Sequence, residues 1–234
     1  MPGMYFWGWD PTYILVLIGA IISMIASANV KSTYNKYSRV RSMTGLTGAE
    51  AAQRILNSQG IDDVRIEHVS GQLTDHYDPR AHVLRLSDAT YASTSVAAVG
   101  VAAHECGHAV QHARAYAPLQ MRSALVPVVQ FSSSIVQWVL LAGMFMIHSF
   151  PQLLLIGICL FAMTTLFSFI TLPVEIDASR RALVWLSGAG VTNASNHRQA
   201  QDALKSAAYT YVVAALSSLA TLVYYITIFT NRRE

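Results

Sequence analysis

The sequence predicts a mainly α-helical integral membrane protein, with about four transmembrane helices and a small α+β domain inserted between the first and second of them. Of its 234 residues, 53% are hydrophobic and only 12% are Asp, Glu, Lys or Arg, whereas ordinary soluble domains carry roughly 25% charged residues. Three stretches of 20, 52 and 26 residues contain no such charge, and all 29 charged residues lie in the other 136. This distribution excludes a simple soluble enzyme, a disordered chain and a disulfide-stapled secreted scaffold.

Four segments are long and apolar enough to cross a bilayer, which takes about 20 residues in a helix. The first is Tyr13–Val30. The 52-residue stretch suits two spans, Ala124–Ile147 and Gln152–Leu172, with a break at His148–Pro151. The fourth is Ala208–Thr230. Because the connection between the second and third spans is so short, we expect these two to form a helical hairpin.

The first span has a second interpretation, a cleaved signal peptide with Ala26-Ser27-Ala28 as its cleavage site. A signal peptide begins with a basic region, but Met1–Asp10 contains no Lys or Arg. Aromatic residues crowd the start of the segment, as is typical of a membrane interface: Tyr5, Phe6, Trp7, Trp9 and Tyr13. We therefore expect the segment to be retained as a transmembrane helix.

Basic residues near the span ends predict the orientation, because they accumulate on the cytoplasmic side. Only Arg232 and Arg233 lie on the side opposite to the large loops. Ten lie on the loop side: Lys31, Lys36, Arg39, Arg41, Arg114, Arg122, Arg180, Arg181, Arg198 and Lys205. We expect a multi-pass protein of the cell membrane with its N-terminus outside and both large loops in the cytoplasm. The net charge of +3 is too small and too scattered to indicate nucleic-acid binding.

These features divide the chain into five parts. They are an N-terminal interface segment with the first span, a soluble domain, a transmembrane hairpin, a short helix and loop, and the last span with its tail: residues 1–30, 31–122, 123–173, 174–206 and 207–234.

Local patterns predict four elements in the soluble domain. A capping box formed by Thr47 and Glu50 begins a helix that runs to about Ser58 and ends before Gly60. The segments Val64–Val69 and Ala81–Leu86 have strand character, and the turn at Asp78-Pro79 suggests a β-hairpin or the edge of a small sheet. A further helix spans Ser93 to about Ala117, capped by Ser93, Thr94 or Ser95.

The last of these helices contains His104-Glu105-Cys106-Gly107-His108, which has the HExxH pattern of zinc sites. Helical spacing places His104 and His108 one turn apart on one face, so both imidazoles can bind one ion. Glu105 lies beside them, where it can accept a proton from zinc-bound water as a general base. Two ordinary histidines on a helix are the alternative, but the predicted helix favours a site for Zn²⁺.

A catalytic zinc needs a third protein ligand and an open position for water. His112 continues the same face, but it lies about 12 Å along the helix from His104, too far for both to bind one ion. We expect it to contact the ligands or to lie at the surface. Glu175 is the better candidate, because the hairpin returns the chain to the face it left just before Glu175. A metal would pair an acidic group that is otherwise costly at a span end, although Glu175 could also simply mark the water interface.

Two segments, HECGHAVQH at His104–His112 and LPVEIDASRRA at Leu172–Ala182, resemble the YugP-like neutral zinc metallopeptidases, which are multi-pass membrane proteins. The similarity covers nearly the whole chain. It implies a gluzincin-type metallopeptidase, with a distant likeness to HtpX-like and prenyl-protein endopeptidases. In those relatives the last ligand is the Glu of an ExxxD motif, which falls on Glu175. The Asp of that motif falls on Ser179, so the chain departs from the pattern, and Asp177 is the candidate to replace it.

The sequence therefore predicts a membrane zinc metalloendopeptidase in which His104, His108 and Glu175 hold the metal and Glu105 activates the water. Both metal-binding segments adjoin spans, so we expect the zinc at the cytoplasmic interface. The expected partners are then the lipid bilayer and membrane proteins or membrane-bound peptides as substrates. A zinc-stabilised scaffold or partner-binding protein without proteolytic activity is the alternative. A transporter or channel is disfavoured, because the second and third spans contain no Asp, Glu, Lys, Arg or His, and His148 lies only at their turn.

Several other residues are weaker candidates for a role in the reaction. The reaction needs a hydrogen-bond donor for the oxyanion, and candidates for this role or for contacts with the metal ligands are His82, His112, Asp177, Ser179, His197, Tyr209 and Tyr211. As oxyanion donors, His82, His197, Tyr209 and Tyr211 are each better explained as structural residues. The strand Ala81–Leu86 could offer its edge to an extended substrate. We expect Gly107 to allow close backbone approach and Cys106 to be a small buried residue rather than a redox group.

Overall fold

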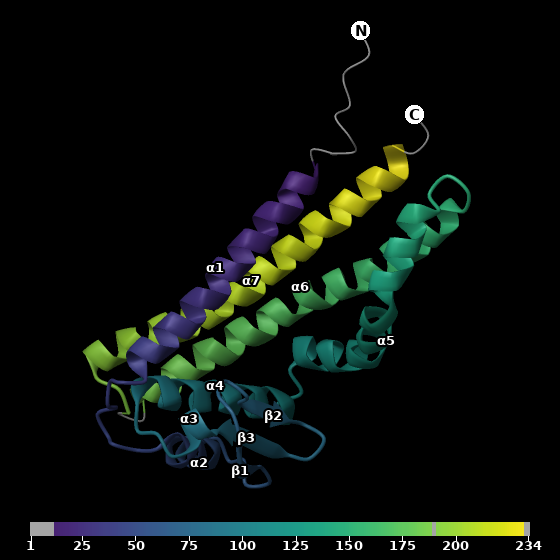
Figure 1. Ribbon diagram of the computed structural model, residues 1–234. Helices are drawn as coiled ribbons and strands as arrows, with labels where there is room; N and C mark the ends of the chain where they lie inside the picture. Colours follow the sequence, from purple (N-terminus) through teal and green to yellow (C-terminus); the bar gives the residue numbers. More distant parts are fainter. Residues whose placement is uncertain (1–11, 189–190, 232–234) are drawn as a thin grey trace. The chain divides into compact units, whose positions relative to one another are not determined.

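The computed structural model describes residues 12–188 and 191–231. Within these ranges seven helices and three strands follow one another along the chain (Figure 1): α1 (Thr12–Tyr37), α2 (Gly48–Ser58), β1 (Arg65–Val69), β2 (His76–Asp78), β3 (Val83–Ser87), α3 (Asp88–Tyr91), α4 (Val96–Ala113), α5 (Ala117–Phe145), α6 (Pro151–Gly188) and α7 (Ala194–Asn231). The protein is thus mainly helical with one small sheet, as the sequence predicts. The aromatic residues before Thr12, and Arg232 and Arg233, lie outside the described residues.

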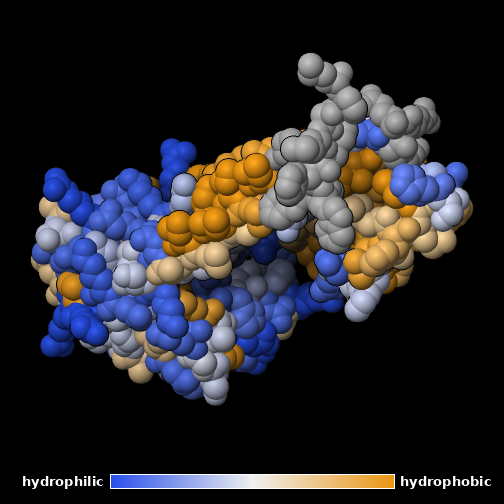
Figure 2. Space-filling view, turned by 45° about the horizontal axis from the view of Figure 1, so that its top comes forward, coloured by the Kyte–Doolittle hydropathy of each residue, from blue (hydrophilic) through white to orange (hydrophobic). Residues whose placement is uncertain are grey.

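Four of the described helices are long and apolar enough to cross a membrane: α1, α5, α6 and α7. This confirms the predicted number of spans. Large apolar side chains remain exposed along them, among them Ile18, Ile25, Phe131, Trp138 and Leu216. Figure 2 shows hydrophobic residues gathered over part of the surface, as is required of helices that face lipid.

The chain forms two compact units. The described part of the first consists of residues 12–25, 121–171 and 211–231, and the second consists of residues 26–120 and 172–210. The first unit contains the apolar stretches of α1, α5, α6 and α7. The second unit contains α2, α3, α4 and the sheet, together with the remaining turns of α1, α6 and α7 and the first turn of α5. The predicted spans are therefore only parts of longer helices, and α6 continues through Pro173 without a break.

Small residues bring the helices of the first unit close together. The break predicted at His148–Pro151 lies between α5 and α6. A Cβ atom on Gly143 would come within 2.6 Å of the Leu154 backbone, so the hairpin needs glycine at this position. The Thr165 and Ser218 hydroxyls lie 2.7 Å apart and link α6 to α7. Such close contacts and hydrogen bonds between side chains are how transmembrane helices associate without a hydrophobic driving force.

Local capping residues explain where α2, in the second unit, begins and ends. Thr47 and Glu50 form both hydrogen bonds of the predicted capping box, and α2 ends at Ser58. Gly60 follows with a φ of +70°, a left-handed conformation that glycine adopts at little cost. The apolar face of α2, which includes Ile55 and Leu56, packs into the core of this unit.

The sheet has the order β1-β3-β2. Of the two predicted arrangements, the β-hairpin was wrong, whereas the two strands do belong to a small sheet. The two predicted strands are neighbours, but β1 and β3 run parallel. The three-residue strand β2 lies between them in sequence and pairs antiparallel with β3, around the turn at Asp78-Pro79. Because β3 has a strand on each side, its edge is not available to a substrate, and that expectation was wrong.

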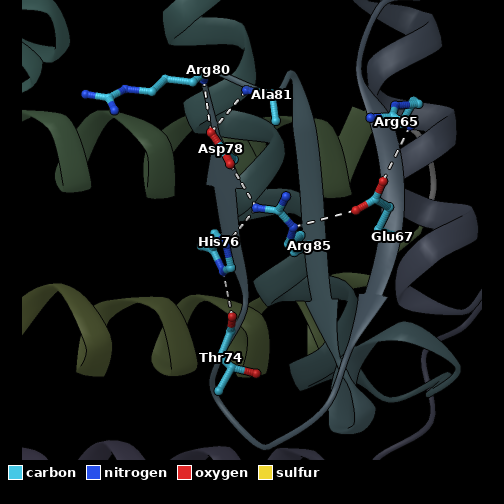
Figure 3. A network of polar contacts seen from close by, with 8 residues as sticks. All are labelled: Arg65, Glu67, Thr74, His76, Asp78, Arg80, Ala81 and Arg85. Carbon is cyan, nitrogen blue, oxygen red and sulfur yellow. Dashed lines mark hydrogen bonds and ion pairs between the residues drawn. The ribbon is translucent and has the colours of Figure 1, made fainter.

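Arg85 on the central strand ties the three strands together on one face of the sheet (Figure 3). Its guanidinium lies 2.9 Å from Asp78 on β2 and 3.6 Å from Glu67 on β1. Asp78 also accepts the backbone N–H groups of Arg80 and Ala81, which closes the turn into β3. Cross-strand pairs of opposite charge stabilise a sheet in this way. On the other face, Leu84 and Leu86 pack into the core.

The helix α4 runs through the centre of the second unit. Ser95 is its N-cap, with its hydroxyl accepting the N–H of Ala98, and this confirms one of the three predicted caps. The helix ends at Ala113, earlier than predicted, because Ala115 takes a φ of +50° and turns the chain into α5. Most side chains of α4 are buried, and Val99, Ala103 and Val110 belong to the core.

Gly107 on α4 allows α6 to approach closely, as its sequence position suggests. A Cβ atom at Gly107 would lie 2.8 Å from both the Cα and the carbonyl oxygen of Ala178. Backbone atoms cannot yield as a flexible side chain does, so a larger residue must push the two helices apart. Gly107 lies immediately before His108, and Ala178 lies three residues after Glu175. The spacing of α4 and α6 therefore controls the distance between these two residues.

We expect Gly107→Ala to lower the free energy of unfolding by about 1–3 kcal/mol through overpacking against α6. Gly100→Ala is the matched control on the same helix, because nothing lies within 4 Å of a Cβ atom there. The control should be neutral or stabilising by up to about 1 kcal/mol, since alanine favours a helix over glycine. Thermal unfolding in detergent, followed by circular dichroism, measures both. Equal losses in the two variants would show that the close approach to Ala178 is unimportant.

Candidate metal centre

Two elements that are far apart in sequence supply the candidate metal ligands. His104 and His108 lie one turn apart on α4, and Glu175 lies on α6. One ligand atom from each lies within 4.8 Å of the others. In the part of the chain that the structure describes, this is the only group of three or more His, Cys, Asp or Glu side chains close enough to bind a metal ion. The topology predicted from the hairpin thus brings Glu175 to the HExxH segment.

The two imidazoles present the same ring nitrogen to the carboxylate. Nε2 of His104 lies 3.2 Å from Oε2 of Glu175, and Nε2 of His108 lies 3.6 Å from the same oxygen. The Glu175 side chain is only 3% exposed, and the two histidine side chains are 14% and 11% exposed. A buried carboxylate requires charged or hydrogen-bonding partners. Two imidazole nitrogens and one carboxylate oxygen are also the protein ligands of many catalytic zinc sites, so these residues fit zinc.

The charges around His108 favour a cation at this position. Burial alone lowers the pKa of His108, but the hydrogen bond to Glu175 and the negative charges of Glu105 and Glu175 raise it above its usual value. The net effect shows that these carboxylates stabilise positive charge at the imidazole. The same negative charges would stabilise a metal cation bound in place of the proton.

The other nitrogen of each imidazole has its own partner. The Ser179 hydroxyl lies 3.1 Å from Nδ1 of His104. The side-chain oxygen of Gln111 lies 3.1 Å from Nδ1 of His108. Such hydrogen bonds orient metal-binding histidines and leave the opposite nitrogen for the metal. The structure thus brings Ser179 to His104 even though a serine replaces the aspartate of the related motif.

Gln111 is the residue at this centre that the sequence reasoning missed. Its side chain is completely buried, and its amide nitrogen lies 2.8 Å from the Val174 carbonyl oxygen and 2.9 Å from Asp177. Asp177 therefore reaches the histidines only through Gln111. The sequence position of Gln111 could have indicated this contact, because Gln111 lies three residues after His108 and so shares its helix face.

Glu105 lies on α4 between the two histidines in sequence and is 9% exposed. In the part of the chain that the structure describes, no hydrogen bond or ion pair occupies its carboxylate. Its negative charge contributes to the raised pKa of His108, which places it near the imidazole. Glu105 is thus a buried acidic group beside the metal ligands, free of a competing partner among the described residues.

The remaining candidates do not belong to the group of three ligands. His112 lies 3.0 Å from the Tyr77 hydroxyl, and the rings of His82 and His112 are 5.3 Å apart. His197 contacts Thr192 and lines a cavity of about 630 Å³ between α6 and α7, whose wall also includes Ser179. Tyr209 is 54% exposed.

Cys106 is a packing residue. It is completely buried, and its thiol lies 3.6 Å from the Ala52 carbonyl oxygen. Burial, and then the charge of Glu105, raise the pKa of the Cys106 thiol. The thiolate is the reactive form of cysteine, so the surroundings of Cys106 oppose redox chemistry and fit the expected small buried residue.

Comparison with known proteins agrees with this geometry. A family model described as "Putative neutral zinc metallopeptidase" matches residues 12–230. A Bacillus subtilis (strain 168) protein named "Putative membrane protease YugP" is 42% identical over 223 residues, which are 95% of this chain and 98% of that protein. No solved structure matches the chain. The family model and the relative show that the chain belongs to this family of neutral zinc metallopeptidases, and the group His104, His108 and Glu175 is placed to bind a metal ion.

Proposed function

We propose that the protein is a membrane-embedded zinc metalloendopeptidase of the HExxH-plus-Glu type, which hydrolyses peptide bonds of membrane-associated proteins or peptides at the cytoplasmic interface. The observation that carries this proposal is the convergence of His104, His108 and Glu175 beside the buried Glu105. The family match supports peptidase chemistry at this site.

Each residue has a distinct part in the proposed reaction. His104 and His108 would hold zinc through Nε2, and Glu175 through its carboxylate. When bound, zinc supplies a Lewis acid for the scissile carbonyl and lowers the pKa of a water ligand. The Glu105 carboxylate accepts a proton from the attacking water and then donates it to the leaving amide nitrogen. Its lack of a competing hydrogen bond among the described residues suits a group that must exchange protons.

The proposed substrate class follows from the helix that carries the third ligand. Glu175 lies three residues beyond the predicted span Gln152–Leu172, and both belong to the uninterrupted helix α6. Three residues correspond to about 4.5 Å along a helix. Glu175 would therefore lie close to the membrane surface, where proteins and peptides held in the bilayer can reach it.

We expect Glu105→Gln to retain zinc but to lose hydrolysis by a factor of about 10² or more, because the amide cannot accept the proton. Zinc content by atomic emission and cleavage of a mixed fluorogenic peptide library by the purified protein measure the two effects. Glu67→Gln, on the exposed face of the sheet, is the control and should leave both unchanged. This experiment separates a peptidase from a zinc-stabilised scaffold, and unchanged hydrolysis in Glu105→Gln would refute the proposed mechanism.

We expect Glu175→Ala to lose bound zinc, because two imidazoles alone bind the metal much more weakly than three ligands. Zinc per protein chain is measured after dialysis against a weak chelator. Glu67→Ala tests whether the loss is specific to this carboxylate, and circular dichroism checks that the helices remain. Full zinc occupancy in Glu175→Ala would exclude Glu175 as the third ligand.

The cytoplasmic location of the site can be tested by labelling cysteines in whole cells. In a Cys159→Ser background, Ser58→Cys places a thiol on α2, and Ser149→Cys places one in the loop between α5 and α6. A membrane-impermeant maleimide should label Cys at position 149 in intact cells, but Cys at position 58 only after lysis. The reverse pattern would place the metal centre outside the cell.

A further inference from the structure

Gln111 is a completely buried polar side chain for which the proposed reaction has no use, and all three of its polar contacts lie at the metal centre. Its oxygen Oε1 lies 3.1 Å from Nδ1 of His108. Its nitrogen Nε2 lies 2.8 Å from the Val174 carbonyl oxygen and 2.9 Å from Oδ2 of Asp177. One side chain thus connects a metal ligand on α4 to two acceptors on α6, close in sequence to Glu175.

The contacts on α6 determine which way the Gln111 amide points. A backbone carbonyl oxygen and an ionised carboxylate can only accept hydrogen bonds. The amide group that faces both must therefore be the NH₂, which has two hydrogens to donate. A flipped amide would place its oxygen against two other oxygens with no hydrogen between them. Val174 and Asp177 therefore fix the oxygen of Gln111 toward His108.

This orientation selects one tautomer of His108. The amide oxygen can only accept, so Nδ1 of His108 must carry the hydrogen that it receives. In a neutral imidazole the lone pair is then on Nε2. Nε2 is the nitrogen that faces Glu175 and the other ligand atoms. The contact thus prepares His108 in the form that binds a metal.

Asp177 is itself paired with a cation. Nε of Arg181, one turn later on α6, donates a hydrogen bond of 2.6 Å to the same Oδ2 atom. Arginine remains protonated under all ordinary conditions. The Arg181 guanidinium also lies over the ring of Tyr116, with its carbon 5.9 Å from the ring centroid, which restricts its position. Arg181, Asp177 and Gln111 therefore form a chain of hydrogen bonds that ends at His108.

His104 lacks such a determinant. Its Nδ1 faces the Ser179 hydroxyl, which can either donate or accept a hydrogen bond. Ser179 is therefore compatible with both tautomers of His104. The hydrogen-bond partner therefore selects one tautomer of His108 but neither tautomer of His104.

We propose that Gln111 is a positioning residue, which fixes His108 as its Nδ1–H tautomer for metal binding and is itself oriented by Asp177 and the Val174 carbonyl. This inference rests on the proposed zinc site but not on peptide hydrolysis. Gln111 would touch neither the substrate nor the reacting water. Its effect would appear in the affinity for zinc and in the state of the His108 ring.

The first test compares zinc affinity in the purified full-length protein, by competition with a chromophoric chelator. We expect Gln111→Leu, which has a similar size but no polar group, to bind zinc about 10- to 100-fold more weakly, the range typical of such partners of metal ligands. Ser179→Ala is the matched control at the other histidine and should have a smaller effect. An affinity of Gln111→Leu within twofold of wild type would overturn the proposal.

The second test removes one of the two acceptors that orient the amide. Asp177→Ala deletes the carboxylate and leaves the Val174 carbonyl oxygen, so one acceptor instead of two holds the NH₂ group of Gln111. We expect Asp177→Ala to bind zinc more weakly than wild type, but with a smaller loss of affinity than Gln111→Leu. A larger loss in Asp177→Ala than in Gln111→Leu would overturn the proposal.

The third measurement observes the ring directly. In the zinc-loaded protein labelled with ¹⁵N-histidine, the Nδ1–H proton of His108 should resonate downfield and exchange slowly with water. Gln111→Leu should shift this signal upfield and speed its exchange, whereas the control variant Glu67→Gln should leave it unchanged. An unchanged signal in Gln111→Leu would refute the role of Gln111. If the wild-type protein binds zinc but cleaves no peptide, the proposed function fails, and these measurements still decide the role of Gln111.

Discussion

The close packing of α4 against α6 is the constraint on which the metal centre depends. His104 and Glu175 are 71 residues apart in sequence, but their side chains lie 3.2 Å apart. Only a glycine at position 107 lets the backbones approach this far, because Ala178 occupies the space where a side chain would be. The HExxH pattern allows any residue at its two middle positions. In this protein the fold requires glycine at the second of them, position 107.

The same packing buries charged side chains, and each of them depends on a partner of opposite charge or on a hydrogen bond. The Glu175 side chain is 3% exposed and would be costly to bury without its two histidine partners. Asp177, two residues further along the same helix, pairs with Arg181 and accepts a hydrogen bond from Gln111. Each carboxylate thus has its own partners, which keeps Asp177 from competing with Glu175 for the histidines. The separation of the two acids follows from helix geometry, because residues two apart point in different directions.

The sequence was sufficient for features that are local or that follow from length. The capping box at Thr47, the break near Pro151 and the helical spacing of His104 and His108 each depend on a few neighbouring residues. The position of Glu175 followed from a topological argument, since two spans return a chain to the side from which it left. The parallel pairing of β1 and β3 could not be anticipated, because β2 has only three residues and is too short to show a strand pattern. The continuation of α6 was also hidden, since proline is disfavoured inside a helix and Pro173 therefore resembles a helix end. Gln111 was missed because its chemistry is that of a common surface residue, and only the fold shows that it is buried.

The order of the ligands along the chain has a consequence for biosynthesis. A ribosome makes His104, Glu105 and His108 first, then the whole of α5 and most of α6, and only then Glu175. The nascent chain therefore has an incomplete ligand set until the helical hairpin has emerged and Glu175 can fold back onto α4. Assembly of the metal centre is thereby tied to membrane insertion. On the function proposed here, a newly made molecule stays inactive until Glu175 has been synthesised and has packed against α4.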